Sequence, residues 1–127
     1  MDLKSIKTKD APEPIGPYSQ AIESNGFIYT SGQIAIVPST GQLLDGDVVE
    51  QTHQVLNNLK AVLLTAGSGM NQVVKTTIYL KNMDDFPKVN AAYSEYFVDT
   101  PPARSTVEVS RLPKNVLVEI DCIAIKR

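Results

Sequence analysis

The chain has 127 residues, of which 43% are hydrophobic and 20% are charged, and its formal net charge is −2. These values suit one soluble globular domain, and the small negative charge gives no general attraction to nucleic acid or to anionic membranes. A single cysteine excludes an intrachain disulfide, and with a single histidine it disfavours a zinc site. The sequence shows neither the apolar core of a signal peptide nor a run of roughly 20 apolar residues that could span a membrane. We therefore expect one cytoplasmic domain over residues 1–127.

The first part of the chain predicts short strands between loops. Residues 3–8 alternate weakly between apolar and polar side chains, which indicates a short edge strand. Residues 10–20 hold three prolines and a glycine, and residues 34–46 hold a proline and two glycines. Both of these segments are therefore expected to be loops.

A hairpin is predicted between the two loops. Residues 21–24 and 27–31 flank Asn25-Gly26, the strongest two-residue turn signal, because both residues tolerate positive φ. Gly32 directly follows the second strand and would let another group approach the backbone closely.

Two helices are predicted in the rest of the chain. Residues 47–65 repeat apolar side chains at spacings of three and four, which is typical of a helix packed on a core. A second helix is expected to begin at Asp84 or Asp85, with Pro87 in its first turn, where proline is tolerated. The prolines at 101 and 102 are expected to end it.

The remaining strands carry the polar residues of greatest interest. Strands are predicted over residues 73–80, from Arg104 onward, and over 116–125. The last of these has Glu119 and Asp121 on an otherwise apolar face, and polar residues in such a position often mark a functional site. We expect Arg104 and Glu119 to converge on neighbouring strands, either as a structural ion pair or as the core of a site.

These elements predict an α+β fold in which two helices cover one face of a mixed sheet of about six strands. The last strand points one apolar row to the core, namely Val116, Val118, Ile120, Cys122 and Ala124. The uncovered face is too apolar to remain wet, so we expect neighbouring subunits to cover it. That face would hold Tyr29, Thr77, Tyr79, Ile123 and Ile125.

Several motifs together resemble the reactive-intermediate deaminase family, known as Rid or YjgF, and its RidA subgroup most of all. The strongest similarity is Pro-Ala-Arg-Ser-Thr-Val-Glu-Val at residues 102–109, followed by Arg-Leu-Pro-Lys at 111–114 and Val-Glu-Ile at 118–120. It continues at the same order and spacing in residues 11–12, 15–20, 30–33, 57–63, 74–77 and 89–90. The resemblance therefore spans nearly the whole chain.

This resemblance implies a chorismate-mutase-like fold and a homotrimer with active sites in the clefts between subunits. RidA proteins hydrolyse 2-imino acids, chiefly 2-iminobutanoate and 2-iminopropanoate, to 2-oxo acids and ammonia without a metal or an organic cofactor. Their substrates arise from enamines that pyridoxal-phosphate-dependent dehydratases release. The resemblance thus implies small-molecule imines as ligands and a functional link to such dehydratases.

The family's functional residues can be placed on this sequence by motif. The arginine that holds the substrate carboxylate falls on Arg104, and the glutamate that activates water falls on Glu119. Many relatives have a cysteine where Thr106 stands, but the family uses mainly the backbone carbonyl there, so threonine should be compatible. Four further pocket residues fall on Tyr18, Ser31, Gly32 and Asn90.

Simpler interpretations exist for most of these positions. Without the resemblance, Tyr18 is an ordinary loop anchor and Asn90 an exposed helix residue. His53 beside the first helix stripe is expected to be a boundary residue, and Cys122 a small buried hydrophobe. Two other functions stay open. One is a regulatory protein that binds small carboxylates without turnover. The other is the ribonuclease or translation-inhibitor activity ascribed to some relatives, which the negative net charge of the chain disfavours.

Overall fold

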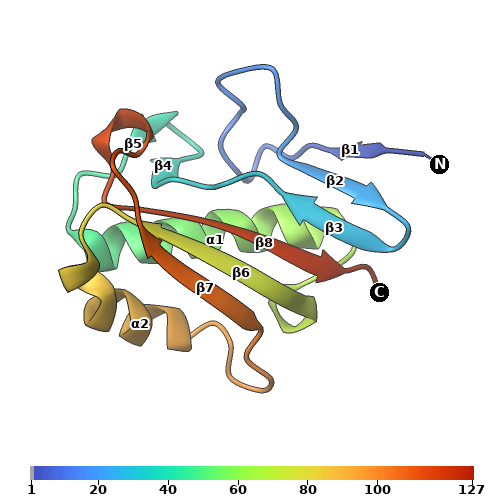
Figure 1. Ribbon diagram of the computed structural model, residues 1–127. Helices are drawn as coiled ribbons and strands as arrows, with labels where there is room; N and C mark the ends of the chain where they lie inside the picture. Colours follow the sequence, from blue (N-terminus) through green and yellow to red (C-terminus); the bar gives the residue numbers. More distant parts are fainter. Residues whose placement is uncertain (1) are drawn as a thin grey trace.

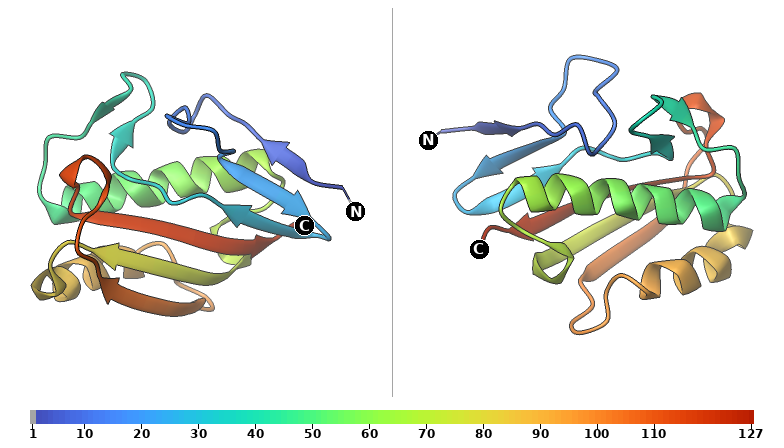
Figure 2. Two further views of the ribbon diagram at one scale, coloured as in Figure 1. Left: turned by 45° about the horizontal axis from the view of Figure 1, so that its top comes forward. Right: turned by 180° about the vertical axis from the view of Figure 1, so that it is seen from behind.

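The computed structural model describes residues 2–127, which form a six-stranded sheet with two helices on one face (Figures 1 and 2). The strands lie in the order β1-β2-β3-β8-β6-β7, and every neighbouring pair is antiparallel except β6 and β7. Their bounds are β1 (Lys4–Ile6), β2 (Ala21–Ser24), β3 (Phe27–Thr30), β6 (Val73–Leu80), β7 (Ala103–Glu108) and β8 (Val118–Ile125), and the helices are α1 (Val48–Thr65) and α2 (Phe86–Ser94). This is the predicted α+β architecture.

Local signals fixed the hairpin and the start of α1. Asn25 and Gly26 have φ values of 52° and 81°, so both central turn residues are in the left-handed region, as the sequence predicted. Asp47 caps α1 through its side chain, which accepts a hydrogen bond from the Glu50 amide at 2.9 Å. The Glu50 side chain in turn accepts a bond from the Asp47 amide at 3.1 Å, which completes a capping box.

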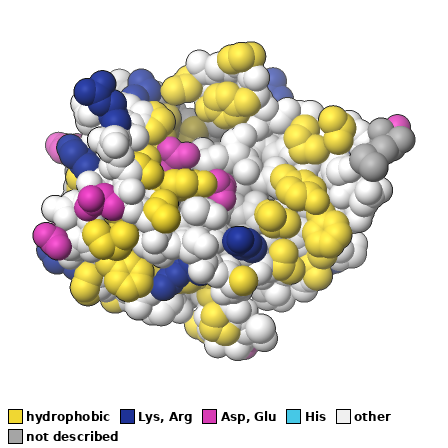
Figure 3. Space-filling model, viewed as in Figure 1, with side chains coloured by type: hydrophobic (Ala, Val, Ile, Leu, Met, Phe, Trp, Pro, Cys, Tyr) yellow, Lys and Arg dark blue, Asp and Glu magenta, His cyan; other side chains and the backbone are white. Residues whose placement is uncertain are grey.

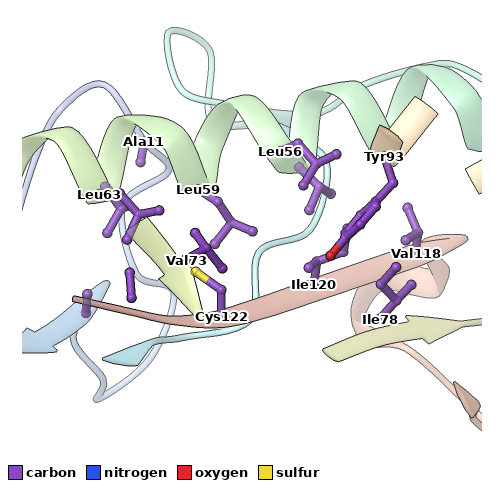
Figure 4. Close-up of a cluster of buried hydrophobic side chains, with 14 of the residues drawn as sticks. Ala11, Leu56, Leu59, Leu63, Val73, Ile78, Tyr93, Val118, Ile120 and Cys122 are labelled. Atoms are coloured by element: carbon purple, nitrogen blue, oxygen red, sulfur yellow. The ribbon is translucent and has the colours of Figure 1, made fainter. Parts of the chain in front are cut away.

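The core lies between α1 and the sheet (Figure 4). Cys122 belongs to it, as predicted, and burial raises the pKa of its thiol to about 12, so the thiol stays protonated and unreactive. Truncating one of the fully buried side chains to alanine would cost about 2–5 kcal/mol. These side chains include Ile28, Val55, Leu56, Leu59, Val62, Leu63, Ile78, Val118 and Ile120, none more than 1% exposed.

The alternation predicted for β6 is wrong at its start. Strict alternation along residues 73–80 would place Val73 on the uncovered face with Thr77 and Tyr79, and Val74 in the core, but Val73 is 7% exposed and Val74 is 40% exposed. The pairing with β8 shifts register between Val73 and Lys75, which is the mark of a β-bulge. The extra residue reverses which side chains face the core, and the predicted pattern resumes from Thr76 onward.

Two element boundaries also differ from the predictions. Residues 34–46 are not only loop, because β4 (Ile36–Val37) and β5 (Gln42–Leu43) form a small antiparallel sheet. The helix α2 ends at Ser94, well before the two prolines that were expected to end it. A short irregular segment that includes buried Phe97 connects the helix to those prolines.

Within residues 2–127, no helix is long and apolar enough to cross a bilayer.

The face of the sheet away from the helices carries apolar side chains, as predicted (Figure 3). Phe27, Tyr29, Val107 and Ile125 are each between 38% and 45% exposed. The other predicted residues of that face are half-buried in the isolated chain. An apolar face of this kind suits an interface with another protein chain.

Candidate active site

The predicted site residues lie on opposite faces of the sheet. Strand β6 separates β7 from β8, with Arg104 paired to Thr76 and Glu119 paired to Tyr79. Thr76 is buried under the helices, whereas Tyr79 is on the uncovered face, so the two charged side chains point in opposite directions. The prediction that Arg104 and Glu119 converge on neighbouring strands is therefore wrong.

The strand order explains the separation. The segment β6-α2-β7 is a strand-helix-strand unit, which places β7 parallel to β6 along one of its edges. Strand β8 pairs with the other edge of β6, so the β7–β8 connection crosses the end of β6 and does not form a hairpin. The strand-helix-strand order was a signal in the sequence that could have predicted this arrangement.

Glu119 lies in an open pocket of ≈ 340 Å³ on the uncovered face. Tyr18, Ser31 and Gly32 line the same pocket, so the structure brings together four of the predicted residues. The remaining wall is largely apolar, from Pro12, Ile15, Ile34, Ile36 and Pro113. A carboxylate in such surroundings is suited to act on a small, partly apolar molecule.

Two buried amide side chains hold the walls of this pocket. Gln20, which is 2% exposed, donates to the carbonyls of Thr8 and Pro12 at 3.0 and 2.9 Å and accepts from the Thr8 amide at 2.7 Å. On the other side, Asn58 donates to the Ile36 carbonyl at 3.0 Å. The first amide therefore anchors the proline-rich loop that carries Tyr18. Neither role could be predicted from the sequence.

Burial and a neighbouring charge make Glu119 a stronger base than an ordinary glutamate. Desolvation raises the pKa of its carboxyl, and the negative charge of Asp121 raises this pKa further. Within residues 2–127, Glu119 has no ion-pair partner. A partly buried carboxylate of this kind is suited to take a proton near neutral pH.

Gly32 is required beside Glu119 because of space and not because of its backbone conformation. A Cβ atom at this position would collide with the Glu119 carboxylate, lying 2.8 Å from its Cδ. We expect Gly32→Ala to cost less than about 1 kcal/mol of unfolding free energy, since a flexible side chain end can move aside. Displacing the carboxylate should lower, by at least about tenfold, the rate of any reaction in which Glu119 is the base.

Enzyme assays and urea unfolding of the same preparations would check this prediction. Gly16→Ala is the matched control, because its Cβ would be in ordinary contact with Tyr18, at 3.6 Å. Wild-type activity in Gly32→Ala would show that the position of Glu119 is not critical.

Arg104 lies at a second pocket, of ≈ 400 Å³, beside α2. Its Nη1 atom donates to Oδ1 of Asn90 at 2.8 Å, and its guanidinium carbon is 4.9 Å from the ring centroid of Tyr93 and 5.4 Å from that of Phe86. Ring contacts of this kind orient a guanidinium without using its N–H donors. No carboxylate in the described chain forms an ion pair with Arg104, so its fork is available for a planar anion.

Sequence reasoning identified Arg104 and Asn90 but missed their aromatic support. The hydroxyl of Tyr93 is buried against the Thr76 hydroxyl at 2.7 Å. Its ring also lies beside the guanidinium. The spacing of Phe86, Asn90 and Tyr93 on one helix face was the signal that could have revealed this role.

Thr106 shares the helix-side face of β7 with Arg104. Its Oγ1 atom is buried and has no hydrogen-bond partner within residues 2–127. Replacing this hydroxyl with a methyl group removes an unsatisfied polar atom at nearly constant volume. We therefore expect Thr106→Val to raise the unfolding free energy by about 1 kcal/mol, measured by urea denaturation. A destabilised variant would show that the hydroxyl has a partner in the assembled protein.

His53, the one histidine of the sequence, lines neither of these two pockets. His53 is half-buried between the helices, where Nδ1 lies 2.8 Å from the Tyr96 hydroxyl, as expected of a boundary residue. Across residues 2–127, no group of three histidine, cysteine, aspartate or glutamate side chains is placed to hold a metal ion.

Comparisons with known proteins agree with the fold and with the motifs. The family profile described as Endoribonuclease L-PSP matches residues 8–126. A RutC family protein of Pyrococcus horikoshii is 56% identical over 95% of this chain and 96% of its own length. The 2-iminobutanoate/2-iminopropanoate deaminase of Escherichia coli is 46% identical over 98% of each chain. A solved Rid family protein of Yersinia pestis superposes with a TM-score of 0.95, at 54% identity over 98% of this chain and 99% of that one.

Proposed function

Because the chain belongs to the Endoribonuclease L-PSP family, the YjgF/Rid family, we propose that it hydrolyses reactive 2-imino acids to 2-oxo acids and ammonia. This proposal rests on two charged groups that have no ion-pair partner within residues 2–127, each at its own pocket. They are the guanidinium of Arg104, oriented by Asn90, and the partly buried carboxylate of Glu119. A 2-imino acid needs both a cation for its carboxylate and a base for the attacking water. The relative from Escherichia coli carries the name of this activity.

We propose further that each active site forms between two subunits of a homotrimer. Arg104 and Glu119 point away from each other within one chain, so one chain cannot present both to a small substrate. The exposed apolar side chains on the same sheet face as the Glu119 pocket are suited to pack against a neighbouring subunit. In a closed ring, the Arg104 pocket of one subunit would meet the Glu119 pocket of the next.

The reaction then follows from the residues present. Arg104, aligned by Asn90, binds the substrate carboxylate through two parallel hydrogen bonds. Glu119 takes a proton from water as the water oxygen attacks the imine carbon, and passes that proton to the imine nitrogen, which gives a carbinolamine. Glu119 then takes the proton of the new hydroxyl group and passes it to the amino nitrogen, so the C=O bond forms as the C–N bond breaks and ammonia leaves a 2-oxo acid. Tyr18 closes the Glu119 pocket from the loop side.

A coupled assay tests the proposal. Threonine dehydratase, a pyridoxal-phosphate enzyme, releases 2-aminocrotonate, which tautomerises to 2-iminobutanoate, and the protein should accelerate the appearance of 2-oxobutanoate. Heat-denatured protein is the control for buffer-catalysed hydrolysis. An unchanged rate would overturn the proposal, and binding of 2-oxobutanoate without turnover would favour a regulatory protein.

A ribonuclease, which the family's descriptive name suggests, is less well supported by the charges. Glu13 and Glu119 line the same pocket, and the chain carries a net charge of −2. Negative groups at a pocket repel the phosphates of RNA. RNA cleavage that survives stringent purification and disappears in Arg104→Ala would contradict this view.

A further inference from the structure

A second carboxylate lies beside Glu119 and is not used by the proposed mechanism. Asp121 is two residues farther along β8, so both side chains are on the uncovered face of the sheet. Asp121 is half-buried and has no ion-pair partner within residues 2–127. Its polar contact is with Tyr79, whose hydroxyl donates to Oδ2 at 3.0 Å. Tyr79 is itself the cross-strand partner of Glu119.

The geometry points to Asp121 as a positioning residue that, held by Tyr79, makes Glu119 a stronger proton acceptor. This inference rests on the proposed role of Glu119 as the base that activates water. A negative charge two residues away on the same strand face favours the protonated form of Glu119. The hydrogen bond from Tyr79 fixes where that charge lies.

The other groups around Glu119 do not cancel this effect. From the proline-rich loop, Glu13 and the Tyr18 side chain face the same pocket. Among the strand residues that share this sheet face, the cation is Lys75, which is paired with Ile123 and therefore lies beyond Asp121. Lys114 follows Pro113 of the pocket wall, and its side chain is exposed. The charged side chains that share the pocket and the strand face with Glu119, namely Glu13 and Asp121, are thus both carboxylates.

The pKa shifts support this arrangement. Burial raises the pKa of Asp121, and the hydrogen bond from Tyr79 opposes that rise, which helps to keep Asp121 ionised. Burial, Asp121 and Glu119 all raise the pKa of Tyr79, so its hydroxyl remains a donor. The contact between them therefore favours an ionised Asp121 and a protonated Tyr79 hydroxyl, the two states that the arrangement requires.

The test is the pH dependence of kcat/KM for imine hydrolysis. Asp121→Asn keeps an acceptor for Tyr79 but removes the negative charge that favours the protonated form of Glu119. The acidic limb of the pH profile of kcat/KM should therefore move to lower pH by about one unit. The rate at high pH should fall a few-fold, because a weaker base activates water less well. Tyr79→Phe should move the limb in the same direction by less, and should add nothing further in the Asp121→Asn background.

Asp2→Asn is the matched control, since it makes the same change of charge at an exposed position. An acidic limb that stays in place in Asp121→Asn, or that moves equally in Asp2→Asn, overturns the inference while leaving the proposed function intact. Carbon-13 NMR titration of the Glu119 carboxyl gives a readout that is independent of activity. The same downward shift is expected there, and its absence would also overturn the inference.

Discussion

Replacing Arg104 with alanine is expected to lower kcat/KM for imine hydrolysis by about 100- to 1000-fold. Within residues 2–127 the guanidinium donates one hydrogen bond, to Asn90, and none to a carboxylate, so its other N–H donors are free for the substrate. Removing a fork that binds a carboxylate through two charge-assisted bonds leaves the anion unpaired in the site. The fold should persist, because the arginine head lies at an open pocket and not in the core.

Two further variants show whether the geometry of the fork or only its charge is important. Arg104→Lys keeps the charge but loses the planar pair of donors, so an intermediate loss of about tenfold is expected. Arg111→Ala removes an exposed arginine outside both pockets and should leave the rate near that of the wild type. Steady-state kinetics with circular dichroism on each variant would check these values. Full activity in Arg104→Ala would remove Arg104 from the mechanism.

Replacing Glu119 with glutamine is expected to lower kcat by about 1000-fold with little change in KM. The amide preserves the shape of the side chain beside Gly32 but cannot accept a proton from water. Substrate binding should continue, because Arg104 supplies the cation. A variant with a raised KM and an unchanged kcat would instead make Glu119 a binding residue.

The same substitution should stabilise the protein at neutral pH. The folded-state pKa of Glu119 is raised above the ordinary value of 4.5, so the ionised form is disfavoured in the folded state. Wild-type stability is therefore lowered once the pH rises through the raised pKa, and Glu119→Gln is free of this penalty. The gain in Tm should be present at pH 7 and should disappear as the pH falls below 4.5. Thermal unfolding at both pH values would check this expectation, and a lower Tm at pH 7 would contradict it.

The parts of the fold that depend on local chemistry could be predicted from the sequence. Asn25-Gly26 fixes the hairpin, Asp47 and Glu50 fix the start of α1, and apolar spacing places the helix against the sheet. The bulge after Val73 could not be predicted, because alternation alone does not show where a strand gains an unpaired residue.

The candidate site was predicted as a set of residues but not as an arrangement. Motifs identified Arg104 and Glu119, while the faces they occupy depend on β6 lying between their strands. That placement comes from long-range pairing, which local patterns describe poorly. Gln20 was missed for a related reason, since a glutamine at the end of a loop gives no sign of the backbone groups it will bind.

The most direct test of the intersubunit site combines two inactive chains. Differently tagged Arg104→Ala and Glu119→Gln subunits are co-expressed, and assemblies that carry both tags are purified by two affinity steps. If each site takes Arg104 from one subunit and Glu119 from the next, every mixed trimer regains one intact site, or about one third of wild-type activity. Mixed trimers as inactive as either parent would contradict a site shared between subunits.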